Sequence, residues 1–287
     1  MENRPAITII GTGAVGSALL DFFSSEGFPV QSYWNSRGGF IHDKETGEYS
    51  AAPVSFPSDE TVLGEWIFVA TPDGLIASTC GKLAEIPAEW NRKSVIHCSG
   101  NMTSGVCRAV ADKGAVIASL HPLQTFTRGD NKERLKDIHI SLEGDETLTS
   151  RLKQMVVKMG AKPVKLDPSQ KQALHIAAVF ASNYLIALLC TAENLLKEEG
   201  IDNGLNILEP LIRQTLSNVF KRGVDNALTG PVSRGDDISV KEHLEVLAKN
   251  PDHHRLYQLL GKEALLIATK QNRLTDDQVE KLKALFE

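Results

Sequence analysis

The 287-residue sequence has few cysteines, no excess of positive charge and only one long apolar run. Its four cysteines form no CxxC pair and no Cys/His cluster with the spacing of a zinc site. We therefore expect reduced thiols, as in the cytoplasm, and no bound metal. The net charge of -5 provides no broad basic surface, so nucleic acid is not expected as a partner. P-loop, GxSxG and HExxH motifs are also absent.

The one long apolar run covers residues 173–192 and is nearly long enough to span a bilayer. However, His175, Ser182 and Asn183 interrupt it, and no second such run follows. A helix that is apolar on all sides is typical of a buried central helix, or of a helix packed at a subunit interface. We therefore expect no membrane span. The segment MENRPAITII reaches its first expected strand within six residues, so we expect no signal peptide and a cytoplasmic protein.

In the first half of the chain, short apolar runs alternate with helical patterns. Such alternation predicts βαβ units and a mostly parallel, Rossmann-type sheet. We expect strands at residues 6–10, 29–34, 66–70, 94–98, 116–120, 138–142 and 162–166, and helices at 15–25 and 151–159.

Beyond Asp167-Pro168 the strand patterns stop and long amphipathic helical patterns follow. We expect helices at residues 168–199, 205–227, 239–249, 252–271 and 275–286. The fold class is therefore α/β followed by all-α, with an α/β domain at residues 1–166 and a helical domain at residues 167–287.

A glycine-rich turn, Gly11-x-Gly13-x-x-Gly16, follows the first strand and opens the first helix. In a dinucleotide site the first glycine allows a sharp turn, the second a close approach to the pyrophosphate, and the third close packing of helix on sheet. This context predicts a cofactor contact along the whole turn, including Thr12, Ala14 and Val15. The alternative is a tight strand–helix turn that binds no ligand.

No acidic residue lies between Glu26 and Asp43, although a site for NAD usually has a carboxylate at the end of its second strand. The sequence has Asn35, Ser36 and Arg37 there instead. Two short hydrogen-bonding side chains and a guanidinium suit a 2′-phosphate, so we predict NADP(H) rather than NAD(H). The alternative is a solvated surface arginine.

Two further strands end in small residues that permit close contact with the cofactor. Ala70, Thr71 and Pro72 follow one strand, and Ser99 and Gly100 follow the next. Ligands of open α/β sheets lie at the carboxyl ends of the strands. We therefore expect these residues near the ribose and the nicotinamide.

Polar residues that suit a substrate lie in SLHPLQTF (119–126) and in the apolar run. His121 stands at a strand end, and the alternative to a substrate role is a loop histidine bonded to backbone. Lys171 and His175 are four residues apart and share a helix face, and regular helical spacing puts Ser182 on the same stripe, with Asn183 beside it. These side chains either bond to one another and to backbone, or face a wet ligand pocket.

The segment LTGPVSRGDDISVKEHL (228–244) separates two expected helices. Gly230 lies in a tight turn, and the glycine-rich stretch before the next helix suits a carboxylate, with help from Arg234. The alternative is an interhelical loop capped by Asp236 or Asp237.

Taken together, IGTGAVG, VATPD, SLHPLQTF, HIAAVFASNY and LTGPVSRGD resemble one family of Rossmann-like proteins. These are usually labelled NADP oxidoreductases, and their helical C-terminal half is a domain of unknown function. The resemblance covers essentially the whole chain. The family is related to the ketopantoate, pyrroline-5-carboxylate and deazaflavin-dependent NADP reductases and to 3-hydroxyacid dehydrogenases. In that group the helical domain dimerises and closes the cleft over the nicotinamide.

The resemblance implies an NADP(H)-dependent homodimeric reductase of a small carboxylate such as ketopantoate. Lys171 or His175 would be the acid, Asn183 would orient the carbonyl or the cofactor amide, and His121 with Arg234 would bind the carboxylate. Related ketopantoate and hydroxyacid enzymes use a Lys with an Asn one turn later, whereas here His175 follows Lys171. Two alternatives stay open: an imine reductase like pyrroline-5-carboxylate reductase, and a nucleotide-binding regulator without turnover.

Overall fold

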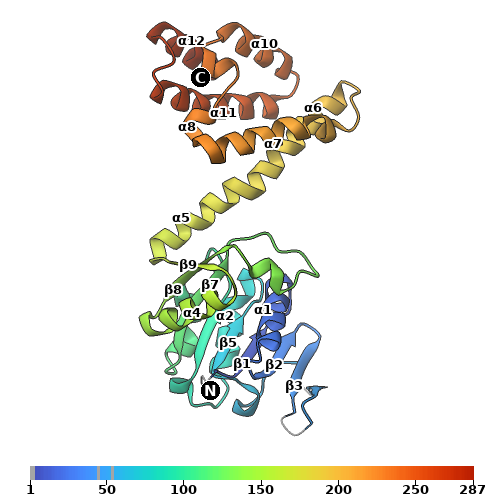
Figure 1. The fold of residues 1–287 in the computed structure, drawn as a ribbon, viewed down its shortest axis with the longest axis vertical. Coiled ribbons are helices and arrows are strands. Elements are labelled where there is room, and N and C mark those ends of the chain that lie inside the picture. The colour runs from blue at the N-terminus through green and yellow to red at the C-terminus, as the bar shows by residue number, and fades with distance from the viewer. Residues whose placement is uncertain (1–3, 44–45, 53–54) are drawn as a thin grey trace. The chain divides into compact units, whose positions relative to one another are not determined.

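A computed structural model describes residues 4–43, 46–52 and 55–287 of the chain. The chain divides into two compact units, Met1–Ser182 and Asn183–Glu287, which are described separately. Figure 1 shows the course of the chain from the blue N-terminus to the red C-terminus.

The first unit contains one sheet, with nine strands in the described residues and the order β4-β3-β2-β1-β5-β6-β7-β8-β9. The pairs β1·β2, β1·β5, β5·β6, β6·β7 and β8·β9 are parallel. This confirms the mostly parallel sheet expected from the sequence. The strands are β1 (Ile7–Ile10), β2 (Val30–Asn35), β3 (Gly38–His42), β4 (Tyr49–Ala51), β5 (Trp66–Val69), β6 (Ser94–His97), β7 (Val116–Pro122), β8 (His139–Gly144) and β9 (Lys162–Lys165).

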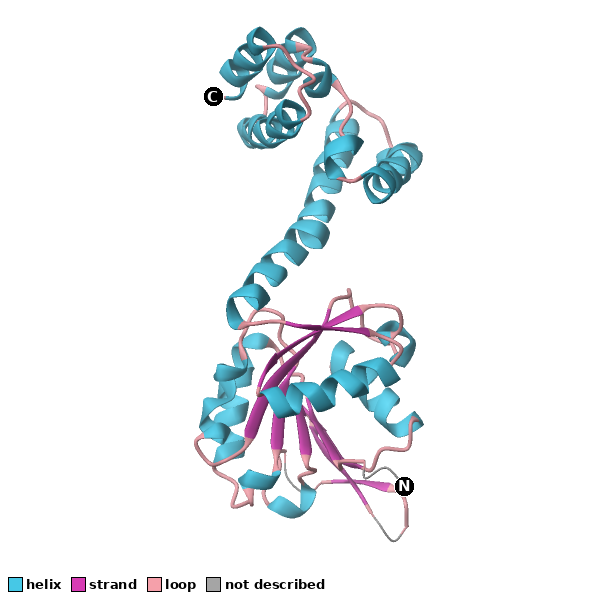
Figure 2. Cartoon of the chain, turned by 60° about the vertical axis from the view of Figure 1, so that its left-hand side comes forward, coloured by secondary structure: helices cyan, strands magenta, loops and turns pink. Residues whose placement is uncertain are grey.

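Helices cover both faces of this sheet, as Figure 2 shows with magenta strands between cyan helices. One face packs against α1 (Ala14–Ser25) and α4 (Glu146–Lys158), which bury Leu19, Phe23 and Leu152 there. The other packs against α2 (Asp73–Ala84), the short α3 (Arg108–Ala111) and the 3-10 turn η3 (Ser104–Cys107). Because both faces are covered, the central strands are apolar along their length, which is why short apolar runs predicted them.

Two strands were not expected from the sequence. β2 turns back into β3 and β3 into β4, and both pairs are antiparallel. Asn35 pairs with Gly38, so Ser36 and Arg37 form a two-residue hairpin turn. Gly39 fits against the Trp34 ring, where any side chain would collide with it. A strand beginning with two glycines lacks the apolar pattern on which the sequence prediction depended. β8 also runs antiparallel to β7.

The change from strands to helices occurs at residue 166, as expected, but the first compact unit extends to Ser182. It includes α5 (Pro168–Val179), which begins at Asp167 with a capping box formed with Gln170. A π-helical turn, Phe180–Tyr184, joins α5 to α6 (Leu185–Glu198). Pro168 stands in the first turn of α5, and Thr275 caps the last helix, Asp276–Phe286.

The second unit has its buried core at the C-terminal end. Val232, Val240, Leu244, Leu265 and Phe286 pack together there. The helices that bring them together are α9 (Pro231–Arg234), α10 (Asp237–Leu247), α11 (Pro251–Lys270) and α12 (Asp276–Phe286).

The remaining helices of the second unit are α6, α7 (Gly204–Arg222) and α8 (Val224–Ala227), and each carries exposed apolar side chains. On α7, Leu211 is 64% exposed and Phe220 is 85% exposed. The segment Pro168–Glu198 is long and apolar enough to cross a membrane by length and composition alone, and none of its most apolar stretch is buried. One such helix is weak evidence for a membrane span, and its exposure differs from the buried central helix that the sequence suggested.

Candidate functional site

The parallel strands β1, β2, β5, β6 and β7 end at the same edge of the sheet in the first unit. Ligands of open α/β sheets bind outside such carboxyl ends. Most of the predicted site residues of this unit follow these strand ends or, as with Lys171, hydrogen-bond to a loop there.

The glycine-rich turn has the geometry that the motif predicted. Gly11 has φ +98°, and a side chain there would lie 2.6 Å from the carbonyl group of Ala70. A side chain at Gly16 would collide with the Gly11 carbonyl oxygen. A Cβ added at Gly13, in contrast, would have no atom within 4 Å. The backbone beside Gly13, which caps helix α1, is therefore open to a pyrophosphate, as a dinucleotide site requires.

The hairpin after β2 fixes the position of the predicted phosphate-binding group. The Arg37 backbone N–H donates a hydrogen bond of 2.8 Å to Asn35 Oδ1, which closes the turn. Ser36 and Arg37 are exposed at its tip. The Asn35 amide is thus partly used in holding the turn, while the guanidinium extends into solvent at the carboxyl edge.

The loops after β5 and β6 carry side chains that the sequence assigned to the cofactor. Ala70 donates its N–H to the Ile10 carbonyl, and Pro72 precedes helix α2. The Thr71 hydroxyl is buried and has no hydrogen-bond partner among the described residues, so its hydrogen-bonding capacity is unused there. Ser99 has a different use: its hydroxyl accepts the N–H groups of Asn101 and Met102 at 3.2 and 3.1 Å and organises the loop.

Lys171 is the most unusual side chain of the site. It is 1% exposed although it carries an amine, and Nζ donates a hydrogen bond of 2.8 Å to the Ser99 carbonyl oxygen. Burial lowers its pKa from 10.5 to about 8, against the opposing effect of Glu143, the largest of the nearby charges that raise it. A lysine in this state loses its proton near neutral pH, so it can serve as a proton donor there.

Three histidines surround the same loop. The rings of His121 and His175 lie edge to face with centroids 6.2 Å apart, and a side chain at Gly100 would collide with both. Burial and then Lys171 lower the pKa of His121, and also that of the fully buried His97, to about 4. Both rings are therefore neutral at pH 7. His121 can hydrogen-bond a substrate but does not offer it the positive charge that a carboxylate prefers.

The helical stripe predicted through Ser182 does not continue along the chain. The π-helical turn Phe180–Tyr184 has a wider turn than an α-helix, so the spacing of 3.6 residues fails there. Ser182 donates its hydroxyl to the Ala178 carbonyl at 2.7 Å. Asn183 begins the second unit. Only Lys171 and His175 keep the face predicted for them.

In the second unit the loop with Gly230 and Arg234 is well tied down. Gly230 has φ +95° and precedes the short helix α9, and Gly235 packs against Gln278, which donates to the Arg234 carbonyl. Asp236 caps helix α10 by accepting from Ser239 N–H at 3.0 Å and from its hydroxyl at 2.7 Å. Asp236 therefore acts as a helix cap, which was the alternative to a ligand-binding loop. The Arg234 side chain is exposed.

Sequence analysis missed a buried row of polar side chains. His97 on β6 is paired in register with Ser119 on β7, and Ser119 with Glu143 on β8. His97 Nε2 and the Ser119 hydroxyl have no hydrogen-bond partner among the described residues. The sequence does indicate this row, because each of these polar residues interrupts an apolar run. The runs were used only to predict strands, and their polar residues were not considered.

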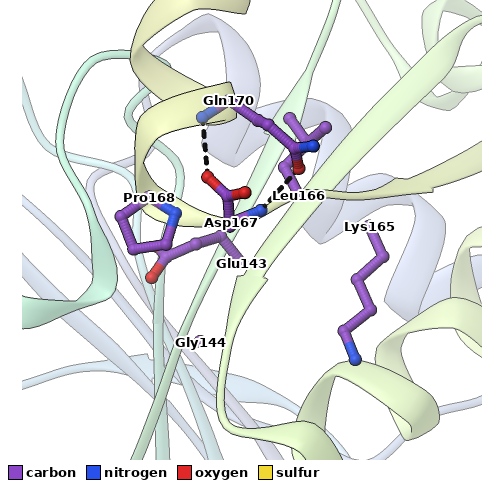
Figure 3. Close-up of a pocket in the computed structure, with 7 residues that line it drawn as sticks. All are labelled: Glu143, Gly144, Lys165, Leu166, Asp167, Pro168 and Gln170. Carbon is purple, nitrogen blue, oxygen red and sulfur yellow. Dashed lines mark hydrogen bonds between the residues drawn. The ribbon is translucent and has the colours of Figure 1, made fainter.

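Glu143 also borders an open groove of about 620 Å³ beside the start of α5, whose lining residues Figure 3 shows. The opposite wall includes Asp167, Pro168 and Gln170, and the dashed lines mark the capping bonds between Asp167 and Gln170. The groove lies one turn before Lys171.

Comparisons with known proteins agree with this fold. Residues 138–264 match DUF2520, a domain of unknown function. No curated protein matches the sequence. The match confirms the C-terminal domain of unknown function that the resemblance implied, although it begins at β8 within the first unit.

Solved structures resemble the whole chain. A provisionally assigned NADP oxidoreductase from Bacteroides fragilis is 22% identical, with 91% of this chain and 98% of that chain covered and a TM-score of 0.69. A protein from Thermotoga maritima is 25% identical, with 93% and 100% covered and the same TM-score of 0.69. Plasmodium falciparum pyrroline carboxylate reductase, solved with NADP bound, is 13% identical, with 100% of both chains covered and a TM-score of 0.55. These likenesses confirm the Rossmann-type fold with a helical C-terminal region.

Proposed function

We propose that this protein is an NADPH-dependent reductase of a small oxo-acid, with ketopantoate as the first candidate. The observation that carries the proposal is Lys171, a fully buried amine at the carboxyl edge of a dinucleotide-type sheet, hydrogen-bonded only to the Ser99 carbonyl among the described residues. Burying such a group costs stability, and strongly perturbed buried groups of this kind are concentrated at functional sites. The structural neighbours that are described as NADP oxidoreductases support the reaction class.

The cofactor proposal rests on the fit of the turn and the hairpin. The open backbone at Gly13 suits the pyrophosphate, and the Thr71 hydroxyl suits a ribose or nicotinamide amide. Arg37 at the hairpin tip, with no acidic residue on that turn, suits a 2′-phosphate. NADPH, when bound, supplies the hydride.

The chain's own residues supply the proton and the orientation. Reduction of a carbonyl leaves an alkoxide, which needs a proton or a strong donor. Lys171, with a pKa of about 8, is our candidate for that acid, and His175 on the same helix face is the second candidate. Neutral His121 and, in the other unit, Asn183 and Arg234 remain proposals for holding the substrate.

Imine reduction is the second candidate function. It is favoured by the likeness to pyrroline carboxylate reductase. A lysine that can be neutral or protonated near pH 8 also suits protonation of the imine nitrogen. The site residues do not separate a carbonyl from an imine.

We also propose a cytoplasmic homodimer. The support is the exposed apolar surface of α6 and α7, which is large for a monomer and which a second copy of the chain would cover.

The test is oxidation of NADPH with ketopantoate, with NADH and a cyclic imine run in parallel. Oxidation of NADPH with ketopantoate but not with the imine supports the leading proposal. Oxidation of NADPH with the imine but not with ketopantoate supports the second. Tight NADPH binding without oxidation of NADPH by either substrate would contradict both proposals and leave a nucleotide-binding regulator.

A further inference from the structure

Two buried side chains of opposite charge stand on elements that pack together in the first unit. Glu143 on β8 is 5% exposed, and Lys171 on α5 is 1% exposed. Helix α5 contacts strand β8 directly. A single charge buried in this way is strongly destabilising, whereas two opposite charges compensate each other.

The Glu143 carboxylate is held in one position. Oε2 accepts the Ser104 backbone N–H at 2.6 Å, and Oε1 accepts the Ser104 hydroxyl at 2.8 Å. Both oxygens therefore act as acceptors, as an ionised carboxylate does. Ser104 opens the turn η3, so two separate segments, β8 and η3, fix the place of this charge.

The other ionisable groups around Lys171 do not replace Glu143. His97 and His121 are neutral at pH 7, each with a pKa lowered to about 4 by burial. Burial raises the pKa of the Cys98 thiol to about 12, so it is neutral too. Asp73 stands in the exposed first turn of α2, where water screens its charge, and His175 shares the helix with Lys171. Glu143 is the one buried anion near Lys171 in the part of the chain that the structure describes.

We propose that Glu143 is the positioning residue for Lys171: held by Ser104, its buried carboxylate favours the protonated form of an amine that the Ser99 carbonyl holds in place. The carboxylate takes no part in the hydride or proton transfer itself. It acts through Lys171, and the inference therefore rests on the proposed function in one respect, the use of Lys171 as the acid.

The test measures the titration of Lys171 directly. Lysine labelled with carbon-13 at Cε is incorporated, and the chemical shift of each lysine is followed against pH in the ligand-free protein. The Lys171 signal is assigned by its absence in Lys171→Arg. In Glu143→Gln, which preserves the shape but removes the charge, we expect the midpoint of Lys171 to fall by about one pH unit or more.

The matched control is Glu146→Gln, which removes an exposed carboxylate on the next helix that pairs with Lys165. It should leave the Lys171 midpoint unchanged. Glu143→Asp keeps the charge, so the Lys171 midpoint should stay close to its wild-type value. A merely structural role predicts instead that Glu143→Asp and Glu143→Gln lower the midpoint equally. If Glu143→Gln does not fold, Ser104→Ala frees one carboxylate oxygen and should shift the midpoint in the same direction by less.

The pH profile of turnover separates this inference from the proposed function. If both hold, the alkaline limb of kcat in Glu143→Gln moves to lower pH together with the Lys171 midpoint. If the Lys171 midpoint moves but the alkaline limb of kcat does not, the inference holds and Lys171 is not the acid. A midpoint that does not move in Glu143→Gln, or in Ser104→Ala where that variant has to be used, overturns the inference, whatever the activity.

Discussion

Asn35 Oδ1 accepts the backbone N–H of Arg37 at 2.8 Å, and this bond closes the hairpin turn between β2 and β3. One residue of the turn therefore holds the backbone while its neighbour presents a guanidinium. A carboxylate at this edge would accept ribose hydroxyls, but here the turn presents a cation.

We expect Arg37→Asp to reverse the cofactor preference. A charge-assisted bond to phosphate contributes about 1.5–3 kcal/mol, so NADPH affinity should fall roughly 10- to 100-fold while NADH affinity holds or rises. Titration of both cofactors by fluorescence measures this. Arg92→Asp, a change at another exposed arginine, is the control and should alter neither affinity. An unchanged ratio in Arg37→Asp would mean that Arg37 is a solvated surface residue.

The three glycines of the turn should differ when each is changed to alanine. Gly11→Ala and Gly16→Ala place a methyl group against backbone atoms and should destabilise the fold by about 1–3 kcal/mol. Gly13→Ala meets open space, so its melting temperature should stay close to that of the wild type. It should nevertheless bind NADPH more weakly, because the methyl occupies the approach to the pyrophosphate. Full NADPH affinity in Gly13→Ala would exclude this turn as the phosphate site.

Removal of the candidate acid should slow turnover without preventing cofactor binding. Lys171→Ala is expected to lower kcat by about 100-fold or more, as loss of a general acid does, with a similar NADPH Kd. His175→Ala on the same face distinguishes the two candidates, because the true acid also removes the alkaline limb of the pH profile. Full turnover in both variants would remove this mechanism.

The fold should lose stability in mild acid through His97. The pKa of folded His97, about 4, is below the ordinary histidine value of 6.5, so between these values the unfolded chain binds the proton and the folded chain does not. The stability is present above pH 6.5 and is lost as the pH falls toward 4, by about 2–3 kcal/mol for this group. Urea unfolding of wild type and His97→Asn at about pH 7 and pH 4.5 measures the difference. Equal losses in both proteins would mean that His97 is not buried in its neutral form.

Charge on the exposed helix surface should prevent association. Leu211→Asp on α7 should convert a dimer into a monomer in light scattering, because a buried carboxylate opposes the interface. Leu75→Asp changes an exposed leucine on α2 and should leave the mass unchanged. A monomeric wild type would contradict the dimer at once.

The parts of this fold that depend on local pattern were predictable from sequence. Apolar runs such as Trp66–Val69 identified the parallel strands, and the positions of Gly11 and Gly16 identified the turn. The β3–β4 hairpin was missed because β3 begins with two glycines, of which Gly39 serves a contact with Trp34 rather than a hydrophobic pattern.

The extent of the first unit and the surroundings of the lysine depend on contacts between distant segments. Lys171 reaches Ser99, 72 residues earlier, and Glu143 reaches Ser104, 39 residues earlier. Periodicity cannot report such pairs. It identified Lys171 as a polar residue on an apolar helix, but neither its burial nor the carboxylate that accompanies it.

The place of β1 in the sheet affects how the chain must be made. β1 precedes the other described strands of the sheet in the chain, yet it lies in the interior of the sheet between β2 and β5. Its pairing with β5 needs Trp66–Val69, about sixty residues later, which takes roughly 3–12 seconds at ribosomal rates of 5–20 residues per second. During that interval one edge of the strand Ile7–Ile10 has no partner strand, and unpaired apolar edges associate with other chains. The nascent strand Ile7–Ile10 therefore needs protection from other chains until β5 has been made.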